Sequence, residues 1–93
     1  MTQDEELRQL ANVFVGKLDE FHIDAVKEYV DHGENTLALE MLCDFLGDHG
    51  VVLSTFEYQE ITRLGVLLDL DINDARFTYL KTLMTTVMSP PRK

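Results

Sequence analysis

The segment that most constrains the fold is residues 36–47, TLALEMLCDFLG, because apolar side chains cover most of its circumference. Two apolar stripes run along it at helical spacing: Leu39, Leu42, Cys43 and Leu46 form one, and Leu37, Met41 and Phe45 form the other. A helix that is apolar on two sides has to be enclosed by other elements. We therefore expect a central helix whose remaining side carries Glu40, Asp44 and Asp48.

Four other segments show the helical period, and no segment shows the alternation that is typical of a β-strand. They are residues 3–18, 23–32, 55–69 and 74–88. Thr2 with Glu5, and Ser54 with Glu57, have the spacing of a capping box at a helix start. These patterns predict an all-α fold, a compact single-domain bundle of four to five helices.

Several positions indicate how these helices end and meet. Gly33 suits the left-handed conformation that ends a helix, and Asn73 is expected to be the N-cap of the last helix. Gly65 lies on the apolar side of its helix, where the absence of a side chain allows another helix to approach closely. Residues 51–53, Val-Val-Leu, are interpreted as a loop anchor and not as a strand.

The length and the cysteine content point to a single domain inside the cell. The 93 residues are too few for two domains, so residues 1–93 are expected to form one helical domain with a frayed tail at 89–93. One cysteine cannot form an intrachain disulfide. The acidic start MTQDEELRQL does not resemble a signal peptide, and no apolar run has the roughly 18 residues of a membrane span. We expect a cytoplasmic protein.

Residues 69–75, DLDINDA, partly match a calcium-binding loop. Asp69, Asp71 and Asn73 occupy the first three ligand positions of such a loop. However, Asp74 stands where glycine is required for the turn, and Leu80 stands where a bidentate glutamate is required. We therefore interpret the segment as a connection between helices.

The remaining residues that could carry chemistry are also too few or badly placed. The three histidines lie near expected helix ends, and Cys43 lies on an apolar stripe, where a small buried side chain is the simpler interpretation. Glu40 and Asp44 could share a proton for acid–base work, but a compact bundle of this length offers little room for a cleft. We expect no enzyme activity, no cofactor and no bound metal.

The acidic residues are concentrated in the middle of the chain. The net charge is −9, and residues 18–60 contain eleven acidic residues but a single basic one, Lys27. This balance disfavours nucleic acid and anionic membranes as partners, and it favours a basic protein. The acidic side chains are expected to form an unpaired surface across the second and third helices, because short connections place consecutive helices side by side. The alternative is a solvated face with no partner.

The stretch from Tyr29 to Leu70 resembles the MafI-type immunity proteins of bacterial polymorphic-toxin systems. The shared features are the His32-Gly33-Glu34 turn, the Ala38-Leu39-Glu40 helix start, the helix begun by Ser54, and the Leu70-Asp71 close. The resemblance covers roughly half of the chain. It implies a small helical protein that binds and neutralises a cognate toxin C-terminal domain.

Many such toxins are nucleases, whose basic groove an acidic inhibitor can occupy in place of phosphate. On this interpretation, which is ours and not a family signature, the partner-binding residues are Asp24, Glu28, Asp31, Glu34, Glu40, Asp44 and Asp48. The alternative is a small helical adaptor or regulatory module that binds its partner in an apolar groove. That alternative predicts binding that depends on Phe45, Tyr29 or Met41.

Overall fold

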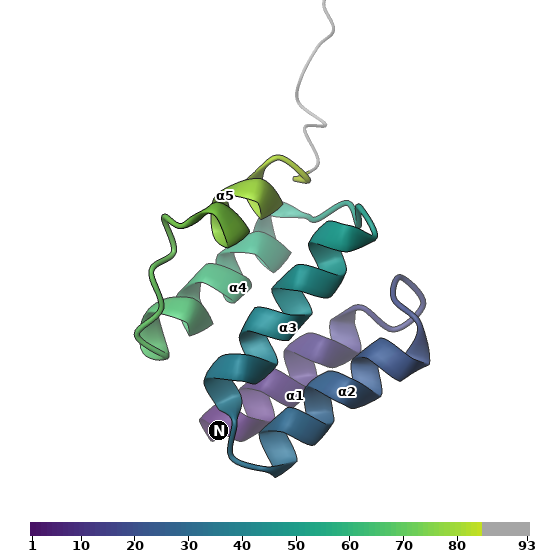
Figure 1. The fold of residues 1–93 in the computed structure, drawn as a ribbon, viewed down its shortest axis with the longest axis vertical. Coiled ribbons are helices and arrows are strands. Elements are labelled where there is room, and N and C mark those ends of the chain that lie inside the picture. Colours follow the sequence, from purple (N-terminus) through teal and green to yellow (C-terminus); the bar gives the residue numbers. More distant parts are fainter. Residues whose placement is uncertain (85–93) are drawn as a thin grey trace, which may run out of the picture.

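The computed structural model describes residues 1–84, which form five helices (Figure 1). They are α1 (Gln3–Val13), α2 (Glu20–Asp31), α3 (Asn35–Asp48), α4 (Thr55–Leu67) and α5 (Ala75–Lys81). The described residues contain no strand, only two isolated β-bridges. The predicted all-α fold is confirmed.

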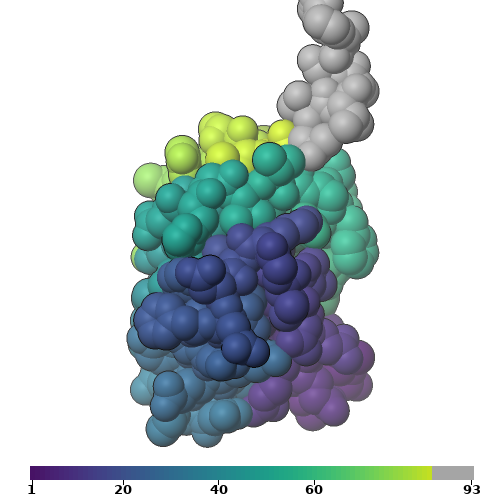
Figure 2. Space-filling view, turned by 90° about the vertical axis from the view of Figure 1, so that its right-hand side faces the viewer, coloured from purple at the N-terminus to yellow at the C-terminus, as the bar shows by residue number. Residues whose placement is uncertain are grey.

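Helix α3 is the centre of the bundle, as its two apolar stripes predict. It contacts each of the other four helices, with α1 and α2 on one side of it and α4 and α5 on the other (Figure 1). Its buried residues are Ala38, Leu39, Leu42, Cys43 and Leu46. In the space-filling view, the purple and blue N-terminal part and the teal to yellow part that follows it form one continuous body (Figure 2). None of the helices in residues 1–84 has the length and apolar character needed to cross a membrane.

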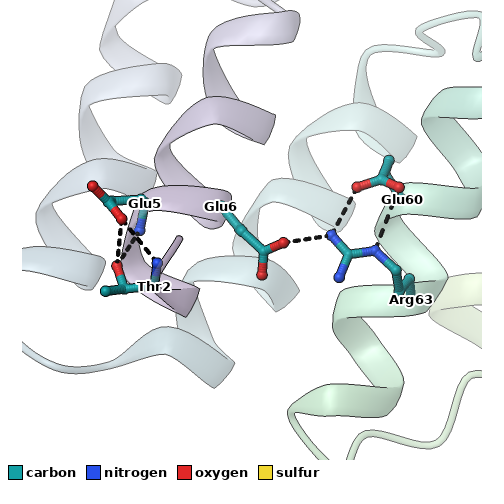
Figure 3. A network of polar contacts seen from close by, with 5 residues as sticks. All are labelled: Thr2, Glu5, Glu6, Glu60 and Arg63. Carbon is teal, nitrogen blue, oxygen red and sulfur yellow. Dashed lines mark hydrogen bonds and ion pairs between the residues drawn. The ribbon is translucent and has the colours of Figure 1, made fainter.

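Both predicted capping boxes are present. The Glu5 amide donates to Thr2 Oγ1 at 3.1 Å, and the Thr2 amide donates to Glu5 Oε1 at 2.8 Å (Figure 3). Ser54 and Glu57 make the same two bonds at the start of α4, at 3.0 and 2.9 Å. Each box satisfies two amides that have no partner within the helix, which defines where α1 and α4 begin.

Gly33 ends α2 in the way its position predicts. Its φ of +75° lies in the left-handed region, where a side chain would be strained. The Gly33 amide donates to the Val30 carbonyl at 2.9 Å, and the Glu34 amide donates to the Tyr29 carbonyl at 2.8 Å. These two bonds are those of a Schellman motif, which turns the chain directly from α2 into α3.

Helix α1 is shorter than the predicted 3–18, and α2 begins earlier than the predicted residue 23. Helix α1 ends at Val13, and the following turn contains Gly16 with a φ of +91°. The buried side chains of Phe14 and Leu18 still contact the core from this turn, which explains why they continue the apolar pattern without being helical. Asp19 then precedes the first turn of α2 in an extended conformation.

The last helix also differs from its prediction. Its N-cap is Asp74 and not Asn73, since Asp74 Oδ1 accepts the Phe77 amide at 3.2 Å. The helix ends at Lys81, and residues 85–88 of the predicted helix, like the predicted frayed tail 89–93, lie outside the described residues.

Leu53 anchors the loop that precedes α4, as predicted. Its side chain is fully buried, and its amide donates to the Leu83 carbonyl at 2.9 Å.

Gly65 is the point where α4 and α5 approach each other, as its position on the apolar side predicts. A Cβ atom built there lies 3.2 Å from Phe77 Cζ and 3.1 Å from Ile72 Cγ2, tighter than ordinary contacts. The missing side chain therefore lets the fully buried Phe77 ring rest against the α4 backbone. This contact fixes α5 against the bundle and positions its neighbour, Arg76.

Candidate protein-binding surface

The three acidic residues of α2 share one side of the helix. Asp24, Glu28 and Asp31 are spaced four and three residues apart, and all three are exposed or partly exposed. Asp31 forms an ion pair with Arg8 of α1. Its carboxylate therefore faces α1, and the prediction that it is unpaired is wrong.

The acidic side of α3 is occupied by α5. Arg76 Nε donates to Asp44 Oδ1 at 2.8 Å, and Arg76 Nη1 lies 3.2 Å from Glu40 Oε2. The hydrogen bond that Arg76 donates to Asp44 is the main cause that raises the pKa of Arg76 above its ordinary value. The prediction that Glu40 and Asp44 are unpaired is therefore wrong, because α5 packs along α3 and brings a guanidinium between them. Asp48, one turn further, is exposed and has no ion pair with any residue in 1–84.

Glu28 and Glu34 are brought together by the turn that Gly33 makes. Both reach solvent, and both line a groove of about 410 Å³ where α2 meets α3. The other lining residues are Ala25, Tyr29, His32 and Leu37. Among residues 1–84, neither carboxylate is in an ion pair.

His32 is fixed at the edge of this groove, which we call the α2–α3 groove. Its Nδ1 lies 2.8 Å from the Glu28 carbonyl oxygen. A carbonyl can only accept, so Nδ1 carries the proton in this bond. The same carbonyl also accepts the His32 backbone amide at 3.1 Å, so the ring adds a second hydrogen bond at the end of α2.

A second cluster of charges joins α1 to α4. Arg63 Nη2 lies 2.9 Å from Glu6 Oε2 and 2.8 Å from Glu60 Oε1 (Figure 3). The hydrogen bond that Glu60 accepts from Arg63 holds the pKa of Glu60 below its ordinary value, and the bonds that Arg63 donates to Glu60 and Glu6 raise the pKa of Arg63. Both carboxylates of this cluster are matched by a cation of the protein itself.

Beside this cluster lies a smaller groove with exposed apolar side chains, which the sequence reasoning missed. It has a volume of about 280 Å³, and its lining includes Met1, Val13 and Phe56. Phe56 is 66% exposed, although it is a large apolar side chain. The signal that could have found it is its place in the first turn of α4, one residue before Glu57 and off the stripe formed by Ile61 and Leu64.

The aromatic residues expected to be anchors of an apolar groove lie partly in the core. Tyr29 and Phe45 pack against the core residues and are only partly buried. Met41 is half-buried on α3. Of the three, Tyr29 alone lines one of these two grooves, and it does so beside Glu28 and Glu34.

Cys43 has the environment of a structural thiol. Its side chain is 1% exposed, and burial raises its pKa from 9.0 to about 12. A thiol that stays protonated and enclosed is a poor nucleophile. In residues 1–84, no three His, Cys, Asp or Glu side chains are grouped closely enough to hold a metal ion.

Among residues 1–84 the arrangement therefore presents two grooves: one combines carboxylates with apolar side chains, and the other exposes apolar side chains. Neither a family model, nor a curated protein, nor a solved structure matches the chain.

Proposed function

We propose that this protein binds a basic protein partner through α2 and the α2–α3 turn. The observation that carries the proposal is the α2–α3 groove, which Glu28 and Glu34 both line and where neither forms an ion pair with residues 1–84. The net charge of −9 supports the same direction, since it attracts a cationic protein over a distance and speeds their encounter.

The resemblance of residues 29–70 to MafI-type immunity proteins suggests what the partner is. We propose a cognate toxin domain, most simply a nuclease with a basic groove, that this protein neutralises by binding. Of the seven residues predicted from the sequence, Asp24, Glu28, Glu34 and Asp48 remain the candidate contacts. Asp31, Glu40 and Asp44 already have arginine partners within the chain, so their contribution to binding is proposed to be smaller.

A second candidate function is favoured by the exposed apolar groove between α1 and α4. Met1, Val13 and Phe56 are the kind of side chains that anchor a partner helix or an extended peptide. On this alternative the protein is a helical adaptor or regulatory module. Its binding then depends on Phe56 and resists salt, because apolar burial is not screened.

The test is protection of cells that express the toxin domain encoded beside this protein. Protection by the wild-type chain is expected, with loss of protection in the double variant Glu28→Gln/Glu34→Gln. The matched control is Asp69→Asn/Asp71→Asn, which removes the same charge from the exposed α4–α5 loop. Asparagine tolerates the φ of 64° at position 69 and can keep the oxygen that accepts the Asn73 amide.

The outcomes separate the two functions. Affinity for the toxin domain is expected to fall steeply between about 0.05 and 0.5 M salt if the acidic surface binds it. Protection that survives Glu28→Gln/Glu34→Gln but is lost in Phe56→Ser favours the apolar groove instead. No protection by the wild-type chain contradicts the immunity function.

A further inference from the structure

Each arginine within residues 1–84 forms an ion pair with an acidic side chain of a different helix. Arg8 of α1 reaches Asp31 of α2, and Arg76 of α5 reaches Glu40 and Asp44 of α3. Arg63 of α4 reaches Glu6 of α1 in the same way. The α2–α3 junction is different, because it brings two carboxylates to one groove without an arginine from the described chain.

The residues that line the groove have the chemistry that suits an arginine side chain. Ala25, Tyr29 and Leu37 form apolar walls, against which the three methylene groups of an arginine stem can pack. The Tyr29 ring offers a π-surface, and Glu28 and Glu34 offer carboxylate oxygens at the solvent edge. A guanidinium both stacks on an aromatic ring and donates in a planar fork to carboxylates.

We propose that the α2–α3 groove is the receptor for one arginine side chain of the partner protein. The arginine supplies from outside the cation that Arg8, Arg63 and Arg76 supply elsewhere within the chain. Arginine fits better than lysine, because a guanidinium is less strongly hydrated than an ammonium and loses less when it leaves water to stack on Tyr29. The inference rests on the proposed function, since the arginine belongs to the same basic partner.

The experiment reads the groove alone, with N-acetyl-arginine amide as the probe. Amide shifts of the ¹⁵N-labelled full chain are followed by NMR while the probe is added up to about 50 mM, a range suited to the weak affinity of a small ligand. We expect saturable shifts at Ala25, Tyr29 and Leu37. Two derivatives serve as comparisons: N-acetyl-citrulline amide has nearly the same shape without the charge, and N-acetyl-lysine amide has the charge without the planar fork.

The expected affinity loss in Glu28→Gln/Glu34→Gln is at least about fivefold, because two charge-assisted hydrogen bonds weaken. Asp69→Asn/Asp71→Asn is expected to bind like the wild type. Equal shifts with citrulline, an equal affinity for lysine, or shifts spread over all acidic sites would overturn the proposal, as would no saturable shift at all.

Failure of this inference can be told from failure of the proposed function. If the protein binds the arginine probe in the groove but does not protect against the toxin domain, the arginine receptor is supported and the immunity function is contradicted. If the protein protects but shows no saturable shift with the probe, the receptor is contradicted and the immunity function is supported.

Discussion

The two acidic regions of this protein look alike in sequence and differ in structure. Glu40 and Asp44 on α3 are four residues apart, and Arg76 bridges both of them. Glu28 and Glu34 are six residues apart across a turn, and both remain free of ion pairs within residues 1–84. We call the first the matched region, because its ion pairs join α5 to α3, and the second the unmatched region, whose charge we propose is offered to a partner.

The difference shows that a run of acidic residues does not define a surface by itself. Whether the acidic side chains stay unpaired depends on whether the fold places a basic helix against them. Asp44 and Arg76 are 32 positions apart in the sequence, so their pairing depends on tertiary structure. A net charge counted along the chain therefore overestimates the free acidic surface wherever distant arginines return to it.

The largest expected effect concerns Cys43, on the central helix α3. Burial raises its pKa to about 12, so its thiolate population at pH 8 is roughly a thousandfold below that of an ordinary cysteine. We expect the native protein to react with 5,5′-dithiobis(2-nitrobenzoic acid) slower by at least that factor than the protein unfolded in urea. Similar rates in both states would show that α3 is not enclosed between the two halves.

The same shift has a consequence for stability at high pH. The unfolded thiol ionises from its ordinary value of 9.0, while the folded thiol stays protonated until its pKa of about 12. The stabilisation is therefore complete below pH 9 and is lost as the pH rises towards 12. A free energy of unfolding that rises over this window in the wild type relative to Cys43→Ala would contradict the burial of this thiol.

The next largest effect is expected from Phe77→Ala, which removes the fully buried ring that fixes α5 against Gly65. Loss of a buried phenylalanine typically costs about 3–5 kcal/mol of the free energy of unfolding. The measurement is urea unfolding followed by circular dichroism. Thr78→Ala, at the exposed neighbouring position on the same helix, is the control and is expected to change stability by less than about 1 kcal/mol.

A cost below about 1 kcal/mol for Phe77→Ala would show that α5 does not depend on this contact. In that case the packing of Phe77 against Gly65 is not what holds Arg76 between Glu40 and Asp44, and the pairing of the matched region needs another cause.

The sequence was most informative where structure depends on near neighbours. The capping boxes at Thr2 and Ser54, and the turn at Gly33, are local devices whose partners lie within five residues. The central position of α3 follows from its own apolar stripes. The sequence was also correct about Gly65, because a glycine on an apolar helix side leaves room that another element can fill.

The sequence was least informative where distant segments decide the outcome. The end of α1 was set too late, since Phe14 and Leu18 are buried from a turn and continue the helical period by coincidence. The division of the candidate acidic surface into paired and unpaired carboxylates could not be foreseen. No local signal says that Arg76 returns to α3 or that Glu34 comes beside Glu28 in a groove.

A smaller effect is expected from Arg76→Gln, which removes the cation of the matched region. Glu40 and Asp44 then repel each other, and we expect the free energy of unfolding to fall by about 1 kcal/mol at low salt, since the pairs are partly exposed. About 0.5 M salt should recover part of the loss by screening. Lys81→Gln removes the same charge from the same helix, but Lys81 forms no ion pair with the described residues, so this variant is expected to cost less. Equal costs for both variants would indicate that the pairing with α3 adds nothing to stability.

The smallest effect on stability is expected from Glu28→Gln/Glu34→Gln in the unmatched region. No ion pair within residues 1–84 is lost, and the negative charge of the chain decreases, so the free energy of unfolding should stay within about 0.5 kcal/mol or rise slightly. Urea unfolding at low salt, beside Asp69→Asn/Asp71→Asn, measures the difference. A surface kept for a partner should be dispensable for folding, whereas Arg76→Gln shows what a charge inside the fold contributes. If the unmatched pair proved as costly to neutralise as Arg76, Glu28 and Glu34 would belong to the fold itself, and the distinction between the two acidic regions would have to be abandoned.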